Sequence, residues 1–194
     1  MSTIIKDGKT GKSARVDSRN RLRTFAVTEN SATDASLDGD TFTTTTGIIT
    51  LTTDNPSALV WMDNTDTETW VISRVFVNNE VSVGGSGKMI LEVIANASTG
   101  TLISAGSDLT PSNLNFGSPK ELTSTAKEGG EGSTLTNGVS VINSIISTSG
   151  VRVLLAGDTL IVEPGSKVGI RLTPPVGNTS IAVQAGFVLH RMIP

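Results

Sequence analysis

One histidine and the absence of cysteine limit the catalytic chemistry that this chain could support. A Ser-His-Asp arrangement would need His190 as its general base, and His190 lies at the end of the last expected strand, beside Arg191. A zinc site takes three or four ligands from histidine, cysteine and acidic residues, which this inventory does not favour. We therefore expect His190 to be structural or on the surface. We predict a protein that is not an enzyme, has no metal site and carries no cofactor.

Two short motifs near the N-terminus carry the last three letters of a phosphate-binding loop. They are Gly8-Lys9-Thr10 and Gly11-Lys12-Ser13. The first glycine of that loop is replaced by Thr3 in one case and by Lys6 in the other, and no strand-to-helix context surrounds either motif. A flexible basic segment explains these residues better than a nucleotide site.

Two groups of acidic residues offer oxygen ligands that could suit Ca²⁺. The groups are Asp34, Asp38 and Asp40, and Asp63, Asp66 and Glu68. Neither matches the twelve-residue calcium loop with its glycine and terminal glutamate. We expect these acids to lie in solvated turns, with weak calcium binding as the open alternative.

The charges of the chain are unevenly distributed. Residues 1–24 hold seven cations and two acids, which gives a formal charge of +5, whereas the other eight cations and sixteen acids give −8. The seven cations of this basic arm are Lys6, Lys9, Lys12, Arg15, Arg19, Arg21 and Arg23. The arm is too short and too poor in large apolar residues to build a core of its own. We expect it to bind a partner that has an acidic surface.

Other classes of partner find less support in the sequence. The arm has one aromatic residue nearby, Phe25, so the stacking of bases that nucleic-acid binding uses is poorly supported. No apolar run follows the N-terminal cations as in a secretory signal, and no stretch approaches the roughly 18 apolar residues of a membrane span. We expect a protein made in the cytosol that does not enter a membrane.

Period-two alternation of apolar residues recurs along the chain from Thr41 onwards. After the threonine-rich run at 41–53, the predicted strands are 57–62, 69–77, 88–95, 139–146, 151–155, 159–163, 167–173 and 180–189. Both faces of 69–77 are apolar, which indicates a strand that is central or covered on both sides. Trp61 and Trp70 alternate with apolar residues and are predicted to lie in the core.

These short strands, separated by glycine and proline turns, predict an all-β protein, an antiparallel β-sandwich of jelly-roll type with an extended N-terminal arm. We divide the chain into the basic arm and a polar linker at 1–40 and a β-sandwich domain at 41–194. Residues 106–136 are dominated by Ser, Gly, Thr, Asn and charged residues, and are predicted to form a long loop or insertion.

The arm also contains a distinctive stretch, Asp7-Gly8-Lys9-Thr10-Gly11-Lys12-Ser13-Ala14-Arg15-Val16-Asp17-Ser18-Arg19-Asn20-Arg21-Leu22. It resembles the opening of a group of tailed-bacteriophage virion proteins that continue into a β domain. The later segments 160–168 and 185–189 are similar in pattern to the end of these jelly-roll-like modules. The resemblance implies a virion component. Capsid cement or decoration proteins, commonly trimers on the capsid lattice, best fit a small acidic β body with a basic arm.

Three readings follow for the function. The first is a capsid cement or decoration protein that binds and stabilises the lattice of the major capsid protein, on the virion surface. The second is a tail or fibre module that binds a host glycan or another virion protein, although only Trp61 and Trp70 could supply aromatic platforms. The third, an enzyme, is disfavoured by the residue inventory. The apolar faces of 69–77 exceed what one sandwich core covers, so we expect a homo-oligomer, with a trimer favoured.

Overall fold

The computed structural model describes the chain except residues 1–3, 7–12, 17–21, 24–30, 148–149 and 193–194. Contacts between residues divide the chain into two compact units, Met1–Asn30 and Ser31–Pro194. The second unit is the body of the protein.

The first unit contains three short antiparallel strands in the order β1-β2-β3. Their bounds are β1 Ile4–Lys6, β2 Ser13–Val16 and β3 Leu22–Arg23. In the register, Arg15 of the central strand pairs with Ile4 on one side and with Arg23 on the other. The segment expected to be an extended arm therefore holds local strand pairing, in which apolar residues such as Ile4 and Val16 favour the strand conformation.

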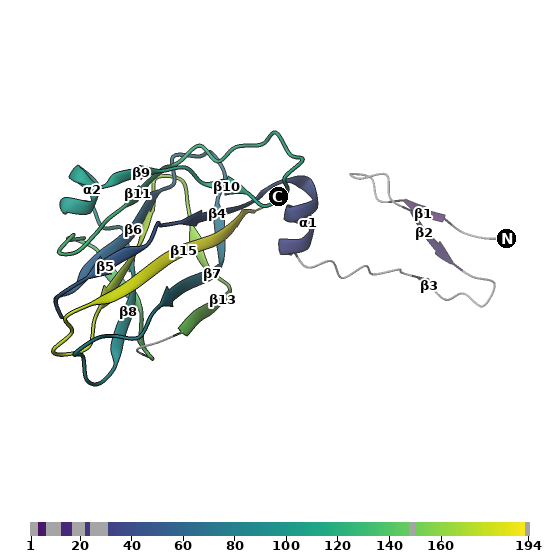
Figure 1. Ribbon diagram of the computed structural model, residues 1–194. Coiled ribbons are helices and arrows are strands. Elements are labelled where there is room, and N and C mark those ends of the chain that lie inside the picture. Colours follow the sequence, from purple (N-terminus) through teal and green to yellow (C-terminus); the bar gives the residue numbers. More distant parts are fainter. Residues whose placement is uncertain (1–3, 7–12, 17–21, 24–30, 148–149, 193–194) are drawn as a thin grey trace. The chain divides into compact units, whose positions relative to one another are not determined.

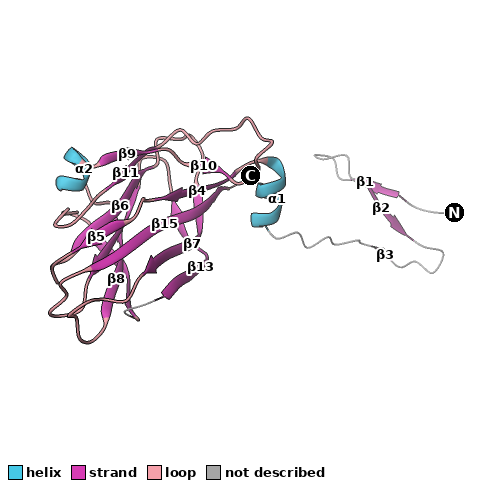
Figure 2. Ribbon diagram, in the orientation of Figure 1, coloured by secondary structure: helices cyan, strands magenta, loops and turns pink. Residues whose placement is uncertain are grey.

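The body is an all-β sandwich of two antiparallel sheets (Figures 1 and 2). The first sheet has the order β10-β4-β15-β7-β13, and β5 also pairs with β15. Its strands are β4 Thr41–Thr45, β5 Ile49–Leu51, β7 Trp70–Asn79, β10 Ser112–Asn113, β13 Gly150–Val162 and β15 Ile181–Arg191. The second sheet has the order β12-β8-β14-β6-β11-β9. Its strands are β6 Ser57–Asp63, β8 Met89–Ala95, β9 Ser107–Leu109, β11 Thr125–Glu128, β12 Val139–Ile146 and β14 Lys167–Thr173.

The strand order is that of a jelly roll. The eight main strands follow one another along the chain as β4, β6, β7, β8, β12, β13, β14 and β15. The first sheet takes the first, eighth, third and sixth of them, and the second sheet takes the fifth, fourth, seventh and second. This interleaving of two Greek keys is the jelly-roll topology, so the predicted fold class is confirmed.

The core lies between the two sheets and is built by the inward side chains of the alternating strands. Its fully buried large side chains include Phe42, Trp70, Ile72, Leu91 and Phe187. Strand β7 lies between β15 and β13, so the prediction of a central strand at 69–77 is confirmed. Trp61 and Trp70 are both buried, as predicted. Burial of side chains of this size is the main favourable term in folding such a domain.

A second, smaller core lies on the outer face of the second sheet. Leu102 of helix α2 (Thr101–Ala105) covers Trp61 of β6 and Ile94 of β8 together with Leu135. The Trp61 indole nitrogen donates to the Ala97 carbonyl over 3.4 Å. One part of this face is therefore packed, and the part towards β12 is left open.

Two segments differ from the sequence-based prediction. Residues 31–38, placed in the polar linker, form helix α1 (Ser31–Asp38), which packs on β4 and β15 through the buried Ala35. Gly39 ends the helix with a positive φ of 77°, and the Asp40 N–H donates back to the Ala35 carbonyl over 2.6 Å, the Schellman pattern. The predicted long loop at 106–136 contains β9, β10 and β11, which extend both sheets.

Candidate functional site

The predicted site residues of the arm fall partly within the described structure. Lys6 lies in β1, Arg15 in β2 and Arg23 in β3. The other four cations, Lys9, Lys12, Arg19 and Arg21, lie outside the described residues. The division between the two units also separates the charges. Residues 1–30 hold the seven cations and three acids, for a formal charge of +4, whereas residues 31–194 hold eight cations and fifteen acids, for −7.

Of the candidate residues for catalysis and metal binding, Asp40 and Asp66 come together, and both bind Arg191. His190 is buried in β15, where it pairs in register with Thr41 and Val71. Within the described part of the chain, no three His, Cys, Asp or Glu side chains gather in a way that could hold a metal ion. The same residues include no helix long and apolar enough to cross a membrane.

Arg191 is the centre of an ion network at the end of the body that carries α1. Its Nε and Nη2 donate to Asp66 Oδ2 over 3.0 and 2.8 Å, and its Nη1 donates to Asp40 Oδ1 over 3.4 Å. Its Nη2 also donates to the Glu121 carbonyl over 2.8 Å, and its guanidinium lies 5.2 Å from the centre of the Phe42 ring. One side chain thus joins the last strand, the start of β4, the loop before β7 and the segment after β10.

This network corrects the prediction of solvated turns for Asp40 and Asp66, whereas Asp38 and Glu68 are exposed, as predicted. Asp40 is buried and binds both Arg191 and Lys120, whose Nζ donates to Asp40 Oδ2 over 2.6 Å. Asp66 has a side chain only 7% exposed and also accepts from the Trp70 indole over 3.4 Å. Burial opposes the charge of Arg191, but the hydrogen bonds to Asp66 and Asp40 and the negative charges of Asp66 and Glu68 together outweigh burial and raise the pKa of Arg191. These acids are structural ion-pair partners.

A second ion pair lies on the open part of the second sheet. Arg171 of β14 donates from Nε and Nη2 to the two carboxylate oxygens of Glu92 on β8, over 2.7 and 2.9 Å. The hydrogen bond from Arg171 lowers the pKa of Glu92 below its ordinary value. Because the two residues are register partners, the bidentate pair fixes neighbouring strands against each other.

Most exposed large apolar side chains of the described residues fall into three patches, with Ile90 and Met192 outside them. The β10-edge patch contains Leu37, Leu114 and Phe116. The β12–β13 edge patch contains Val139, Val141, Ile145 and Ile161. The loop-end patch contains Ile48, Val81, Val83 and Val176, where the β7–β8 and β14–β15 loops pair through two isolated bridges. Exposed apolar groups that cluster in this way are typical of protein interaction sites.

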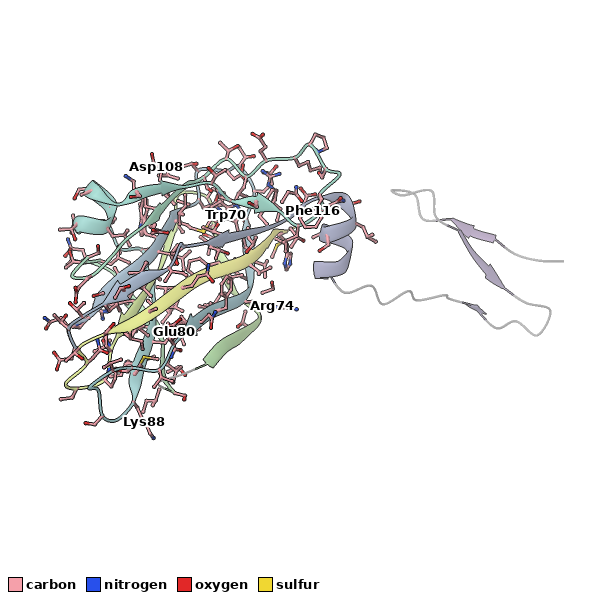
Figure 3. All side chains as sticks on the ribbon, viewed as in Figure 1. Trp70, Arg74, Glu80, Lys88, Asp108 and Phe116 are labelled. Atoms are coloured by element: carbon pink, nitrogen blue, oxygen red, sulfur yellow. The ribbon has the colours of Figure 1, made fainter. Side chains whose placement is uncertain are left out.

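Phe116 is the most exposed of these side chains, at 95%. It lies in the turn after β10, at the end of the body that carries α1 (Figure 3). The turn is held from several sides. The Asn113 amide donates to the Gly39 and Lys120 carbonyls over 2.7 and 2.9 Å, and the Asn115 amide donates to the Leu37 carbonyl over 3.1 Å. The ring is therefore presented by a fixed turn.

A pocket of about 240 Å³ opens between the two sheets at the β12–β13 edge. Its lining combines apolar side chains from both sheets with the polar or charged residues Asn96, Thr159, Ser166 and Lys167. The apolar walls include Ile72, Val93, Val141, Leu160, Ile161 and Val168. Val141 and Ile161, which line this pocket from the two edge strands, are 47% and 54% exposed.

Neither the exposed Phe116 ring nor the pocket was predicted from the sequence. For Phe116 a signal was present, since a lone aromatic residue stands between Asn115 and Gly117 in a polar segment where no core strand was expected. For the pocket no such signal exists, because its lining comes from five separate strands or turns that only the fold brings together.

Comparisons with known proteins give no family. No protein-family model matches this chain, and no curated protein matches it. Among solved structures, it is similar to T=1 particles derived from infectious bursal virus, at 13% identity and a TM-score of 0.19. A mutant VP2 protein of infectious bursal disease virus, also in derived T=1 particles, gives 12% identity and the same TM-score. In both cases the match covers 79% of this chain and 40% of the other chain. Scores this low carry no argument about fold or function.

Proposed function

We propose that this protein is a structural component of a tailed-bacteriophage virion, a capsid decoration protein that binds and stabilises the lattice of the major capsid protein. The observation that carries the proposal is the charge division. A basic segment at residues 1–24 precedes an acidic jelly-roll body, and this segment lies wholly within the first of the two compact units. The arm sequence at 7–22, which resembles the start of such virion proteins, supports the same reading.

Electrostatics gives the basic arm and the acidic body different roles in the proposed function. A segment with seven cations repels itself in isolation and gains from an acidic partner surface. Each exposed ion pair contributes only about 0–1 kcal/mol, so recognition requires several pairs at once. The body, with its rigid sandwich and exposed apolar patches, supplies the surface that remains on the outside of the particle or contacts its neighbours.

The glycan-binding alternative has less support. Sugar-binding clefts use exposed aromatic platforms, but Trp61 and Trp70 are buried in the two cores of the body. Of the aromatic residues that the structure describes, only Phe116 is exposed. A single ring on a protruding turn does not form a cleft, so we retain the virion-lattice reading.

The test is a particle-binding assay with phage capsids that lack this protein. Full-length chain and a variant without residues 1–24 are mixed with the capsids over a range of salt concentrations, and occupancy is measured by sedimentation. We expect binding of the full chain to weaken as salt increases, because screening acts on exposed charges. We expect the truncated chain to lose most of its occupancy at low salt.

A matched variant separates charge from the mere presence of the segment. Asp7→Asn with Asp17→Asn raises the formal charge of the arm from +5 to +7 without shortening it. We expect this variant to occupy capsids more tightly than the natural chain at low salt and equally at high salt. Undiminished, salt-independent occupancy by the truncated chain would show that the arm does not carry recognition. Failure of every form to bind would refute the proposed function.

A further inference from the structure

Phe116 has the features of an anchor for an interface. The chain has only seven Phe and Trp residues, and it places this one in water on a turn fixed by the side-chain amides of Asn113 and Asn115. Further bonds within the turn run from the Gly117 N–H to Asn115 Oδ1 over 3.2 Å and from the Ser118 N–H to the Asn115 carbonyl over 2.9 Å. A rigid, fully exposed aromatic ring loses little conformational entropy on burial, which is why such residues dominate binding energy at interfaces.

The pocket at the β12–β13 edge has the size and chemistry to receive such a ring. Its volume of about 240 Å³ exceeds the roughly 150 Å³ of an apolar cavity that accepts benzene. Its lining includes the half-exposed side chains of Val141 and Ile161. These residues would be covered by a ring that enters between the sheets.

The strand order places the ring and the pocket on opposite edges of one sandwich. Phe116 follows β10, which is the outer strand of the first sheet on one side. The pocket is lined by β13, the outer strand of that sheet on the other side, and by β12, the outer strand of the second sheet. Four strands of the first sheet follow β10 in the order β4, β15, β7 and β13, so one copy cannot fill its own pocket with its own ring.

We propose that the Phe116 ring of one copy inserts into the β12–β13 pocket of a second copy, so that copies of this chain associate head to tail. A contact between two different surfaces leaves one ring and one pocket free in every dimer. It therefore builds a closed oligomer when the rotation from one copy to the next brings the last copy back to the first. It builds an open filament when that rotation does not close. This inference goes beyond the proposed function, because it concerns contacts between copies and does not depend on a capsid.

The first experiment measures self-association of the purified full-length chain, without capsids, by sedimentation velocity between about 5 and 500 µM. We expect species larger than a dimer of the 20.1 kDa chain. Phe116→Ser removes the ring and Val141→Arg blocks the pocket, and each should weaken association by about 30-fold or more, as loss of an interface hot spot does. Circular dichroism confirms that each variant is folded, and Ile161→Arg replaces Val141→Arg if the latter is not.

Matched controls change other exposed apolar residues outside the contact. Val176→Ser removes an apolar side chain, 74% exposed, from the loop-end patch. Val139→Arg introduces the same charge on β12, at a residue 67% exposed that does not line the pocket. Both controls should associate like the natural chain. If a control lost as much association as its partner variant, the assignment of Phe116 and the β12–β13 pocket to the contact would be overturned.

The second experiment mixes Phe116→Ser with Val141→Arg. The first variant keeps an intact pocket and the second keeps an intact ring, so each supplies what the other lacks. We expect one-to-one pairs that grow no further, although neither variant associates alone. A mixture that stays monomeric, or a natural chain that is monomeric or stops at dimers across the concentration range, would overturn the head-to-tail contact. Because no capsid is present, none of these outcomes bears on the proposed function.

Discussion

Replacing Arg191 by methionine should destabilise the body more than any other single change to a charged side chain described above. Methionine keeps the length and apolar stem of arginine but removes all of its donors. The two carboxylates of Asp66 and Asp40 would then remain largely buried, with side chains 7% and 12% exposed. Uncompensated charge in a buried site is the main cause of large destabilisation by such substitutions.

The expected magnitude can be worked out from the contacts. Loss of one partner of a buried ion pair costs about 3–5 kcal/mol. Asp66 would keep its bond from the Trp70 indole, and Asp40 would keep its bond from Lys120, so the lower end of that range applies. A loss of about 3 kcal/mol corresponds to a fall in Tm of roughly 6–12 °C for a domain of this size. Adding Asp66→Asn to the variant should recover part of the loss, since it removes the uncompensated charge.

The assay is chemical denaturation at pH 7 and 25 °C, at one fixed protein concentration, with the free energy of unfolding taken from the midpoint and slope. The control is Lys120→Met, which removes a cation that binds the same Asp40 but whose side chain is 45% exposed. That control should cost no more than about 1 kcal/mol. A loss below about 1 kcal/mol in Arg191→Met, or a loss as large in Lys120→Met, would refute the reasoning that burial makes this network important.

Two further predictions concern the sheets. Because hydrogen bonding to Arg171 lowers the pKa of Glu92 from its ordinary 4.5, the pair stabilises the fold above that pH and loses its contribution as pH falls through the lowered pKa. Arg171→Met should therefore cost about 1 kcal/mol at pH 6 and little at pH 2–3, measured by urea denaturation at both pH values. Gly186→Ala would place a Cβ 2.1 Å from the Thr44 carbonyl oxygen and 2.5 Å from the Phe76 ring, so we expect a loss of about 1–3 kcal/mol by thermal unfolding. Gly130→Ala, which would meet nothing within 4 Å, should change stability by less than about 0.5 kcal/mol, and equal effects at both glycines would contradict the steric explanation.

The alternation of apolar residues was sufficient to predict most strands of the sandwich. Residues 69–77 and 167–173 became β7 and β14 because their inward side chains fill one core, and period-two patterns report that directly. The two strands predicted at 151–155 and 159–163 are one strand, β13, with a register shift between Leu155 and Leu160. The glycine and aspartate at 157–158 suggested a turn, but in a long edge strand an irregularity of pairing can accommodate them.

The elements that the sequence did not predict are those stabilised by polar contacts from distant residues. Helix α1 has few apolar residues to give a period, and it is held by its contacts with β4 and β15. Strand β10 has two residues and depends on pairing with β4 about seventy residues earlier. The ion partners Asp40 and Asp66 lie more than a hundred residues before Arg191 in the chain, so composition alone placed Asp40 and Asp66 in solvent.

The strand order has a consequence for how the body folds during synthesis. Strand β4 opens the jelly roll, but its main partner in the first sheet is β15, about 140 residues later in the chain. At about 5–20 residues per second, the ribosome needs roughly 7–28 s to synthesise that intervening chain. During this time β4 cannot pair with β15. The threonine hydroxyls of β4 can hydrogen-bond to water while the strand is unpaired. The sandwich is therefore expected to close late and cooperatively, after β15 has emerged, with the slow folding of domains dominated by distant contacts.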